Sequence, residues 1–370
     1  MAQSLKVLLL IPHLGGGGAE QVTTLLARGL SREKYELHLG LVTGMDARAG
    51  KLPPWVILHP LGAPRVRAAA VGLLRLVRTL RPDVILSGMA HLNFLVLLLR
   101  PFFPRGTRVL VRQNATVSAA LAFGGLPRFT RPLYKLLYCR ADRIICQSSA
   151  MAEDLAGELG IGADLISVLP NPVDLEGIRS AHANPQPWTG PGPHLLAVGR
   201  LAPEKGFDLL LRALADVRES FPCADLLIAG AGPEEAALKA QCRSLGLEAA
   251  VRFAGRVDCP YVFFPGASLF VLSSRHEGMP NALLEAAAAG LPIVALPASG
   301  GVVDLLRGRP GAWLAPQVSA EALSASLHEA LIALHPGQRF HYQFPIPAGP
   351  ANPTPVPLTA SKLESVETRG

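Results

Sequence analysis

The chain has 370 residues, of which 49% are hydrophobic and 17% charged; this predicts two folded domains and excludes a disordered protein. Five cysteines, an odd number without C-x-x-C spacing, exclude a disulfide scaffold and favour a reducing compartment. Residues 1–180 carry 21 Lys and Arg against 12 Asp and Glu, whereas residues 181–370 carry 14 against 16. The first half is therefore expected to meet an anionic surface. With no secretory cleavage site and no apolar run of about 20 residues, we expect a cytoplasmic protein.

Short apolar runs between turn residues predict buried strands along the first half of the chain. These runs are residues 5–11, 36–42, 84–87, 108–111, 143–146 and 165–169. Stretches with apolar residues at helical spacing, such as 73–80, lie between most of them.

The second half repeats this alternation of strands and helices. Its predicted strands are residues 194–198, 225–229, 251–254, 268–272, 292–295 and 312–315. Alternation with apolar strands predicts an α/β fold of two doubly wound, Rossmann-like domains, with helices on both faces of each parallel sheet and the domains facing across a cleft. We place the domains at residues 1–180 and 194–335, joined by a Pro- and Gly-rich linker, 181–193, and followed by a loosely ordered Pro-rich tail, 336–370.

A run of four glycines, residues 15–18, follows the first strand and opens a helix. Glycines let a ligand approach the backbone, and a helix start presents N–H groups and a positive dipole to an anion. It is not the dinucleotide-binding pattern, because Glu20 stands where the third glycine belongs. The run predicts a contact with phosphate or sugar, and the alternative is a flexible turn.

Two cations follow the strand at 194–198. Arg200 and Lys205 are placed at the carboxyl end of that strand, where Arg grips phosphate oxygens as a fork and Lys acts as a point charge. They predict a diphosphate site. The alternative is a pair of solvated loop cations.

The segment 273–285 joins a strand to a helix that starts near Asn281. Backbone N–H groups from Met279 to Ala282 would point at a phosphate. Glu285, within an apolar helix, would hold two vicinal hydroxyls, and Glu277 lies eight positions earlier. A solvated Glu285 is the alternative. Glycine turns at 229–233 and 299–301 are either tight turns or part of the same site.

Together these motifs resemble the retaining family 4 (group 1) glycosyltransferases of the GT-B fold, in particular the bacterial cell-surface polysaccharide type. The resemblance covers residues 4–335. It rests on GGGGAE (15–20), NPVD (171–174), GRLAPEKG (199–206), GAGP (230–233), FAGRV (253–257) and EGMPNALLEAAAAGLPIVA (277–295).

The resemblance implies transfer of a sugar from a nucleotide-sugar donor, a UDP-sugar, to a lipid-linked or lipopolysaccharide or exopolysaccharide acceptor, with retention of anomeric configuration. It implies catalytic roles for Glu277, Arg200, Lys205 and His91, and acceptor contacts for His91 and Asn114. The donor-binding residues that it implies are Gly16, Gly17, Arg200, Lys205, Gly230, Arg256, Val257, Glu277, Gly278, Met279, Pro280, Asn281 and Glu285.

No Asp-x-Asp pair occurs in the sequence, and the two cations are expected to act in place of a metal ion, so we expect neither a metal nor a cofactor. Two alternatives remain at this point. One is a UDP-sugar 2-epimerase of the same fold, and the other is a degenerate, non-catalytic donor-binding protein with a divergent tail.

Cations decorate two predicted helices of the basic half. Arg75 and Arg78 belong to a cluster within 65–81, and the stretch 126–140 mixes cations with Phe129, Tyr134 and Tyr138. Such helices predict binding to an anionic membrane, here the inner face of the plasma membrane. The alternative is an ordinary solvated face. Nucleic acid is not expected as a partner, because its binding needs cations and aromatics on an open sheet or groove.

Overall fold

The computed structural model describes residues 4–15, 17–43, 52–118, 131–181 and 188–342. It divides into two compact units, one ending at Pro172 and the other beginning at Val173. Helix α7 (Leu175–Ala181) packs on α10 (Asn281–Ala288) and on the 3-10 turn Pro260–Phe263. It thus belongs to the second unit, although the sequence analysis placed it in the first. We describe each unit by itself.

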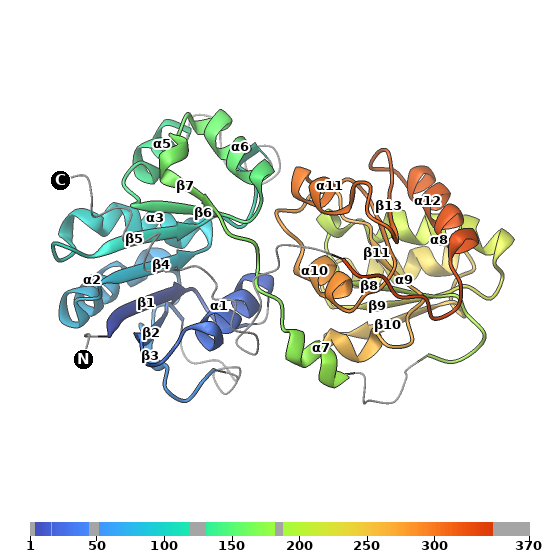
Figure 1. Cartoon of the computed structure of the whole chain (residues 1–370), viewed down its shortest axis with the longest axis horizontal. Coiled ribbons are helices and arrows are strands. Elements are labelled where there is room, and N and C mark those ends of the chain that lie inside the picture. Colours follow the sequence, from blue (N-terminus) through green and yellow to red (C-terminus); the bar gives the residue numbers. More distant parts are fainter. Residues whose placement is uncertain (1–3, 16, 44–51, 119–130, 182–187, 343–370) are drawn as a thin grey trace. The chain divides into compact units, whose positions relative to one another are not determined.

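The first unit contains a parallel sheet whose described strands follow the order β3-β2-β1-β4-β5-β6-β7 (Figure 1). The strands are β1 (Leu5–Ile11), β2 (Tyr35–Leu41), β3 (Ile57–Pro60), β4 (Val84–Gly88), β5 (Arg108–Arg112), β6 (Arg143–Cys146) and β7 (Ile166–Val168). The helices are α1 (Gly18–Gly29), α2 (Ala70–Leu80), α3 (Ala90–Leu99), α5 (Arg131–Tyr138) and α6 (Ser149–Leu159).

Side chains of β1 alternate between two apolar cores. Leu8 and Leu10 join the core formed with α2, α3, α5 and α6, whereas Leu9 and Ile11 join the core on the face that carries Ala27 of α1. Because successive side chains of a strand point to opposite faces, a continuous apolar run is what a sheet covered on both faces requires. The parallel sheet covered on both faces that the sequence predicts for the first half is confirmed.

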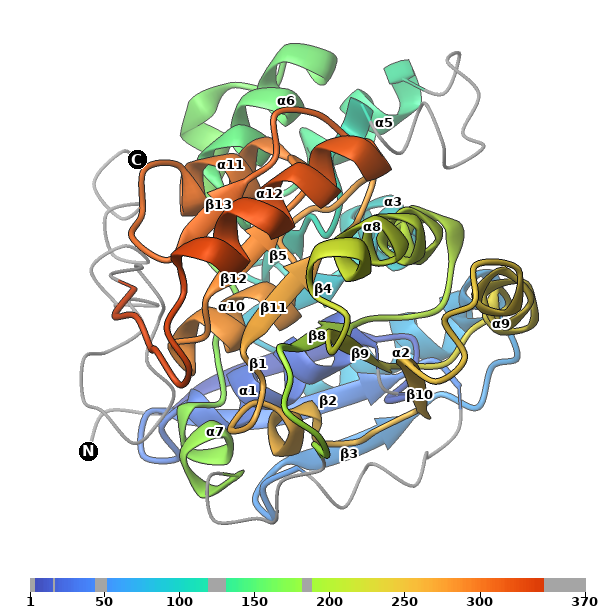
Figure 2. The same ribbon diagram turned by 90° about the vertical axis from the view of Figure 1, so that its right-hand side faces the viewer.

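The second unit contains a parallel sheet in the order β10-β9-β8-β11-β12-β13. Its strands are β8 (His194–Val198), β9 (Asp225–Ala229), β10 (Val251–Gly255), β11 (Leu269–Leu272), β12 (Ile293–Ala295) and β13 (Ala312–Leu314). Besides α7 and α10 it has α8 (Phe207–Ser220), α9 (Glu235–Ser244), α11 (Gly300–Leu306) and α12 (Ala320–Ala333). Helices α8, α9 and α12 share one apolar core with one face of the sheet (Figure 2).

Both sheets are doubly wound, as the sequence predicts. The strand order reverses beside the first strand of each unit, between β1 and β4 in one and between β8 and β11 in the other. In such sheets, ligands bind outside the carboxyl ends of the strands at this switch point. The loops after these four strands are therefore the places to look for a site.

Two sequence expectations need correction. The edge strand β3 has no counterpart among the predicted strands; it is short, its residues are half-buried or exposed, and it ends in Pro60. The start of the expected tail is packed: Phe340 N–H donates to Gly290 O at 2.9 Å, and the Tyr342 hydroxyl donates to Gly311 O at 2.7 Å. The rest of that segment, 343–370, lies outside the described residues.

Candidate active site

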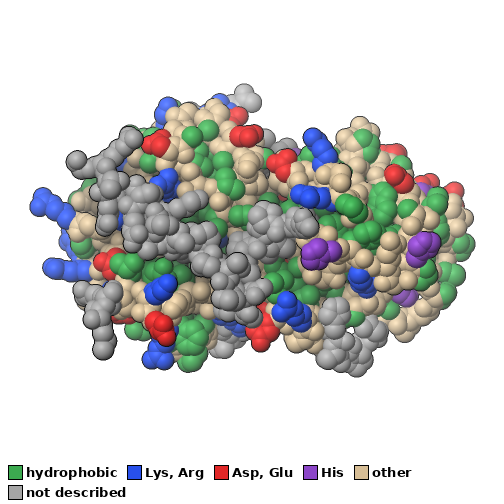
Figure 3. All heavy atoms as spheres, in the orientation of Figure 1, with side chains coloured by type: hydrophobic (Ala, Val, Ile, Leu, Met, Phe, Trp, Pro, Cys, Tyr) green, Lys and Arg blue, Asp and Glu red, His purple; other side chains and the backbone are tan. Residues whose placement is uncertain are grey.

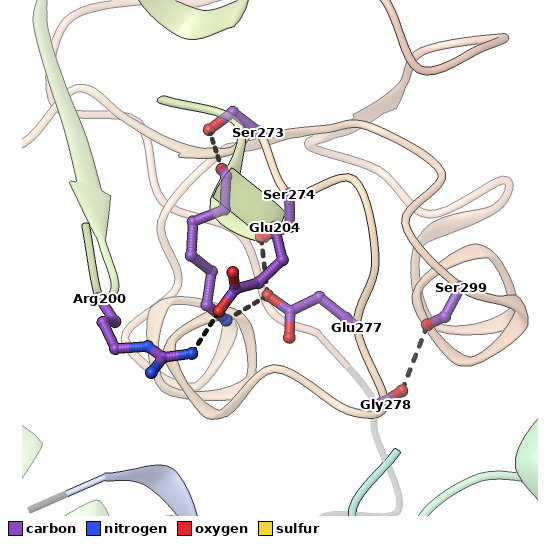
Figure 4. Close-up of polar contacts among 8 residues, drawn as sticks. Arg200, Glu204, Ser273, Ser274, Glu277, Gly278 and Ser299 are labelled. Carbon is purple, nitrogen blue, oxygen red and sulfur yellow. Dashed lines mark hydrogen bonds and ion pairs between the residues drawn. The ribbon is translucent and has the colours of Figure 1, made fainter. Parts of the chain in front are cut away.

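The loops after β8 and β11 meet at an ion pair. Lys205 Nζ lies 2.6 Å from Glu277 Oε1, and the Ser274 hydroxyl donates to the same oxygen at 2.7 Å. The side chains are 23% exposed for Lys205 and 10% for Glu277. Figure 4 shows Glu277 and Ser274 directed toward one another beside Glu204 and Arg200. Two residues that are 72 positions apart in the sequence are thus joined at the switch point.

Arg200 belongs to the same group of charges. Its guanidinium lies 2.5 Å from Glu204 Oε1 and is 68% exposed. Although burial alone raises the pKa of Glu204, backbone hydrogen bonding and the charges of Arg200 and Lys205 lower that pKa below its usual value. Each of the two cations therefore faces a carboxylate: Arg200 that of Glu204 in its own loop, and Lys205 that of Glu277 in the loop after β11. An anionic ligand would have to compete with these carboxylates.

Glycines bring the loop backbones close together. Gly206 has φ +61°, and a Cβ at this position would lie 2.1 Å from Ser273 O. Gly230, after β9, has φ +157°, and a Cβ there would lie 1.8 Å from Gly199 O. Both positions combine a backbone conformation that favours glycine with an approach that excludes any side chain. The glycines of the two motifs thus act first as packing residues, and Gly230 has this role whether or not it contacts a donor.

Arg275 braces the loop after β11 against α8. Its guanidinium donates to both carboxylate oxygens of Asp208, at 2.6 and 2.7 Å, and to Pro203 O at 2.8 Å. Its backbone N–H donates to Glu204 O at 2.8 Å. The hydrogen bond from Arg275 is the main cause of the lowered pKa of Asp208. This cation holds the frame of the site and was not singled out from the sequence.

Helix α10 begins at Asn281, as predicted, and its N-cap, Pro280, provides no side-chain cap. Neighbouring α11 is capped by the Ser299 hydroxyl, which also donates to Gly278 O at 3.2 Å. Gly278 and Pro280 are buried, whereas Met279 and Asn281 are half-buried. The N-cap residue of α10 thus places no side-chain acceptor on the N–H groups of the first turn, an arrangement that suits an anion at a helix start.

Glu285 lies inside the second unit. Its carboxylate is 4% exposed, so the alternative of a solvated face is wrong. Its Oε1 accepts a hydrogen bond from the Tyr261 hydroxyl at 3.2 Å. Burial and the nearby charges of Glu285 and Asp174 raise the pKa of Tyr261. Sequence analysis missed Tyr261; the only signal was a tyrosine just after the FAGRV motif, whose exposed Arg256 and half-buried Val257 follow β10.

The other predicted residues lie in the first unit. Gly16 falls outside the described residues. Glu20 is buried, pairs with His13 Nδ1 at 3.3 Å, and would lie 2.6 Å from a Cβ at Gly17, so the start of α1 already has a carboxylate beside it. His91 is exposed in the first turn of α3, where partial burial and the charge of His13 lower its pKa.

Asn114 follows β5, and its Oδ1 accepts from Gln147 Nε2 at 3.0 Å. Two tyrosines of the predicted membrane-binding stretch are core residues: Tyr134 is 2% exposed and Tyr138 is 0% exposed. They cannot contact a membrane, and Phe129 lies outside the described residues. In the part of the chain that the structure describes, no His, Cys, Asp and Glu side chains cluster as a metal site would, and no helix is long and apolar enough to cross a membrane.

Two family models match the chain, one after the other. The model "Glycosyltransferase Family 4" matches residues 16–176, and "Glycosyl transferases group 1" matches residues 179–334. The second match contains the loops after β8, β9 and β11, and therefore the whole Lys205–Glu277 site.

Individual relatives and a solved structure agree with this match. One relative is the N-acetylgalactosamine-N,N'-diacetylbacillosaminyl-diphospho-undecaprenol 4-alpha-N-acetylgalactosaminyltransferase of Campylobacter jejuni. The two sequences are 28% identical over 311 residues, which are 81% of this chain and 83% of the relative. The chain is 35% identical to an uncharacterised glycosyltransferase of Haemophilus influenzae over 133 residues, 36% of this chain and 38% of that protein. Anabaena HepE, solved with UDP and glucose, has the same fold, with a TM-score of 0.74 and 20% identity over 98% of this chain and 100% of that one. The chain belongs to the group 1 glycosyltransferases of the GT-B fold, and its activity is that of a transferase.

Proposed function

We propose that this glycosyltransferase moves a sugar from a UDP-sugar to a lipid-linked or cell-surface glycan acceptor, with retention of anomeric configuration. The observation that carries the proposal is the Lys205–Glu277 contact, which brings the two charged loops together at the switch point of the second sheet. Ligands of doubly wound sheets bind at this place, and the cation there suits a diphosphate.

The chemistry follows from the charge that develops as the donor breaks apart. When the bond between sugar and diphosphate breaks, negative charge grows on the bridging oxygen. Lys205, Arg200 and the uncapped start of α10 are the groups that would stabilise this charge, and such preorganised stabilisation usually contributes more to catalysis than any other effect. Glu277 lies beside the cation and would contact the transferred sugar. The leaving phosphate would take the acceptor proton on the same face, so this route uses no metal ion.

Glu285 supports a ribonucleotide as the leaving group. Carboxylate oxygens accept hydrogen bonds from hydroxyl groups, as Glu285 Oε1 does from Tyr261, and the vicinal hydroxyl groups of a ribose are donors of this kind. The UDP bound by HepE and the diphospho-undecaprenol acceptor in the name of the Campylobacter enzyme support a UDP-sugar donor and a lipid-linked acceptor. The sugar is not specified by these contacts.

A lipid-linked acceptor calls for a position at the inner face of the plasma membrane. Helices α2 and α5 cover the same face of the first sheet. On α5, Leu133 is 55% exposed and Leu136 is 58% exposed, and α2 presents exposed Arg75 and Arg78. Figure 3 shows Lys and Arg side chains at the margin of the first unit, near α2. Apolar side chains beside cations suit an anionic membrane surface.

Vesicle co-sedimentation tests this position. Wild-type protein is expected to sediment with anionic vesicles more than with neutral ones, and Leu133→Ser with Leu136→Ser is expected to reduce this binding. Ile332→Ser is the matched control, because that leucine-sized side chain is 77% exposed on α12 of the second unit. Equal recovery with both vesicle types would remove the membrane claim and leave the donor site untouched.

A thermal-shift panel of nucleotide sugars tests the donor. A bound donor stabilises the folded protein by RT ln(1 + [L]/Kd), so a UDP-sugar at a hundredfold excess over Kd is worth about 2.7 kcal/mol. The shift should be much smaller in Lys205→Ala and Glu285→Ala and unchanged in Lys239→Ala, which removes a surface lysine of the same unit. Product analysis separates transfer to an acceptor from epimerisation of the donor. UDP release that is unchanged in both site variants would refute the assignment.

A further inference from the structure

The carboxyl ends of β5, β6 and β7 carry a buried polar cluster that the proposed chemistry does not use. Its members, each between 3% and 5% exposed, are Arg112, Gln113, Gln147 and Asn171. Arg112 is the only charged member of this cluster, and the other three are neutral amides. This cluster, which we call the Arg112 cluster, lies within the first unit, at the carboxyl ends of its strands; β5, which carries Arg112, is the neighbour of the switch-point strand β4.

Arg112 has no carboxylate partner among the described residues. Its Nη2 donates to Asn171 Oδ1, while its Nε is buried and has no hydrogen-bond partner in the described part of the chain. Burial alone lowers the pKa of Arg112 to about 10, and no neighbouring acidic side chain opposes that shift. Arg100 of the same unit differs, because Asp142 lies 2.6 Å from its guanidinium.

A guanidinium in this state is costly to the fold. Burying an ion without a partner costs several kcal/mol. A counter-ion and a full set of hydrogen bonds would offset roughly that cost. A neutral amide such as Asn171 offsets only part of it. A buried cation that is kept at a ligand-binding edge, with one N–H unmatched, therefore indicates an anion that is absent from the free protein.

We propose that Arg112 recognises a phosphate or diphosphate group of the acceptor, a proposal that rests on the transferase function above. Nε is the guanidinium nitrogen that is buried without a partner among the described residues, and a planar fork of N–H donors matches phosphate oxygens. Asn114 lies next to the cluster. Its Oδ1 accepts from Gln147, and its amide nitrogen makes no hydrogen bond within the described residues, so that amide is a second donor for the same anion.

A structural role and a ligand-binding role predict opposite effects on stability. If Arg112 holds the fold together, replacing it by Met should lower the melting temperature. If Arg112 is kept for a ligand, Arg112→Met removes an unpaired buried charge, and the melting temperature of the free protein should not fall below that of wild type. Buried ionic groups that are replaced by apolar side chains of similar size often leave the stability unchanged or raise it. The stability of the free protein thus separates the two explanations.

Calorimetric titration of the full chain, saturated with UDP to occupy the donor site, tests the binding. The probes are inorganic phosphate, pyrophosphate and farnesyl diphosphate, and the variants are Arg112→Met, Arg112→Lys and, as a control with the same charge change in the exposed turn before β5, Arg105→Met. We expect at least a tenfold loss of affinity for both diphosphates in Arg112→Met, a smaller loss in Arg112→Lys, and none in Arg105→Met.

Each outcome decides a separate point. Unchanged diphosphate affinity in Arg112→Met, or a lowered melting temperature or failure to fold of that variant, would overturn the proposal. Equal affinity for inorganic phosphate and farnesyl diphosphate would indicate a free-phosphate site and overturn the acceptor assignment. A protein that binds the diphosphates through Arg112 but does not bind UDP would instead contradict the proposed function.

Discussion

Glu277 is expected to oppose donor binding while it assists transfer, and Glu277→Gln separates these effects. In the structure its Oε1 lies 2.6 Å from Lys205 Nζ. A phosphate oxygen on the other side of that ammonium would lie roughly 5 Å from the carboxylate, where two unit charges repel by about 3 kcal/mol at an effective dielectric constant of 20 and by about 1 kcal/mol in bulk water. The pair is partly exposed, so we expect about 1–2 kcal/mol, or roughly 5- to 30-fold tighter UDP binding in Glu277→Gln.

Lys205→Met should act in the opposite direction. It removes the ammonium that is proposed to donate to the diphosphate, a charged hydrogen bond worth about 1.5–3 kcal/mol, and should therefore weaken UDP binding roughly 10- to 150-fold. Titration calorimetry with UDP measures both affinities, and UDP release during transfer shows whether Glu277→Gln is slower despite binding more tightly. Glu235→Gln and Lys239→Met are matched controls, since that pair has the same charges at 2.7 Å on the surface of α9.

The reasoning would be refuted by one pattern in particular. If Glu277→Gln weakens UDP binding as much as Lys205→Met, the carboxylate does not compete with the diphosphate for the ammonium. If the surface pair changes UDP affinity by as much as the site pair, the effect is one of overall charge and not of the site.

Three further predictions concern the frame of the site. Gly206→Ala should lower the melting temperature by several degrees, because φ is +61° and the new Cβ would lie 2.1 Å from Ser273 O. Gly308→Ala is the control: φ is +67° but nothing lies within 4 Å, so the melting temperature should fall less. Equal losses in the two variants would show that the contact with Ser273 O is not the cause. Tyr261→Phe removes a hydrogen bond to Glu285 worth about 1 kcal/mol, and because that bond positions the carboxylate, UDP binding should weaken roughly fivefold. Tyr342→Phe is the control: it loses a hydrogen bond to Gly311 O and should change the stability but not the affinity for UDP. Asp208→Asn should destabilise the protein at pH 7, and this effect should fade as the pH is lowered below 3.8. The folded pKa of Asp208 lies below that ordinary value, so its contribution to stability is present above pH 3.8 and disappears as the pH falls through the folded pKa. Denaturant titrations that show the same loss of stability at pH 7 and below the folded pKa would contradict this prediction.

The fold was predictable from the sequence because buried parallel strands leave a local signal. Strands β6, β8 and β9 begin and end where the apolar runs do, and α8 and α10 begin at the predicted residues Phe207 and Asn281. Strand β3 left no such signal, because an edge strand is only partly buried and needs no continuous apolar run. The packing of Phe340 and Tyr342 was missed for a related reason: the prolines of that segment remove helical and strand periodicity without preventing burial of its aromatic side chains.

The site was predictable in its residue types but not in its contacts. A charged loop residue is recognised from its position after a strand, which is how Arg200, Lys205 and Glu277 were found. Which carboxylate faces which cation depends on loops that meet only in the folded sheet. The bracing role of Arg275 and the phenol of Tyr261 on Glu285 are contacts of this kind, spanning 67 and 24 residues. The mixture of cations and aromatics in 126–140 also predicted a surface position for Tyr134 and Tyr138, although their hydroxyls donate to Gln113 in the core.

Lys205 in the second unit and Arg112 in the first differ in how their charge is balanced, and we infer different roles in ligand binding from this difference. Lys205 is balanced by Glu277 before any ligand arrives, so a diphosphate must displace that contact and gains only the difference between two interactions. Arg112 faces no carboxylate among the described residues, so its desolvation is already complete and an anion reaching it gains nearly the whole interaction. On the proposed function, donor release would therefore be favoured by a built-in competitor, whereas acceptor binding would draw on a charge that the described part of the fold leaves unbalanced. This arrangement would let the nucleotide product leave while the acceptor is still held, as the proposed lipid-linked acceptor would require.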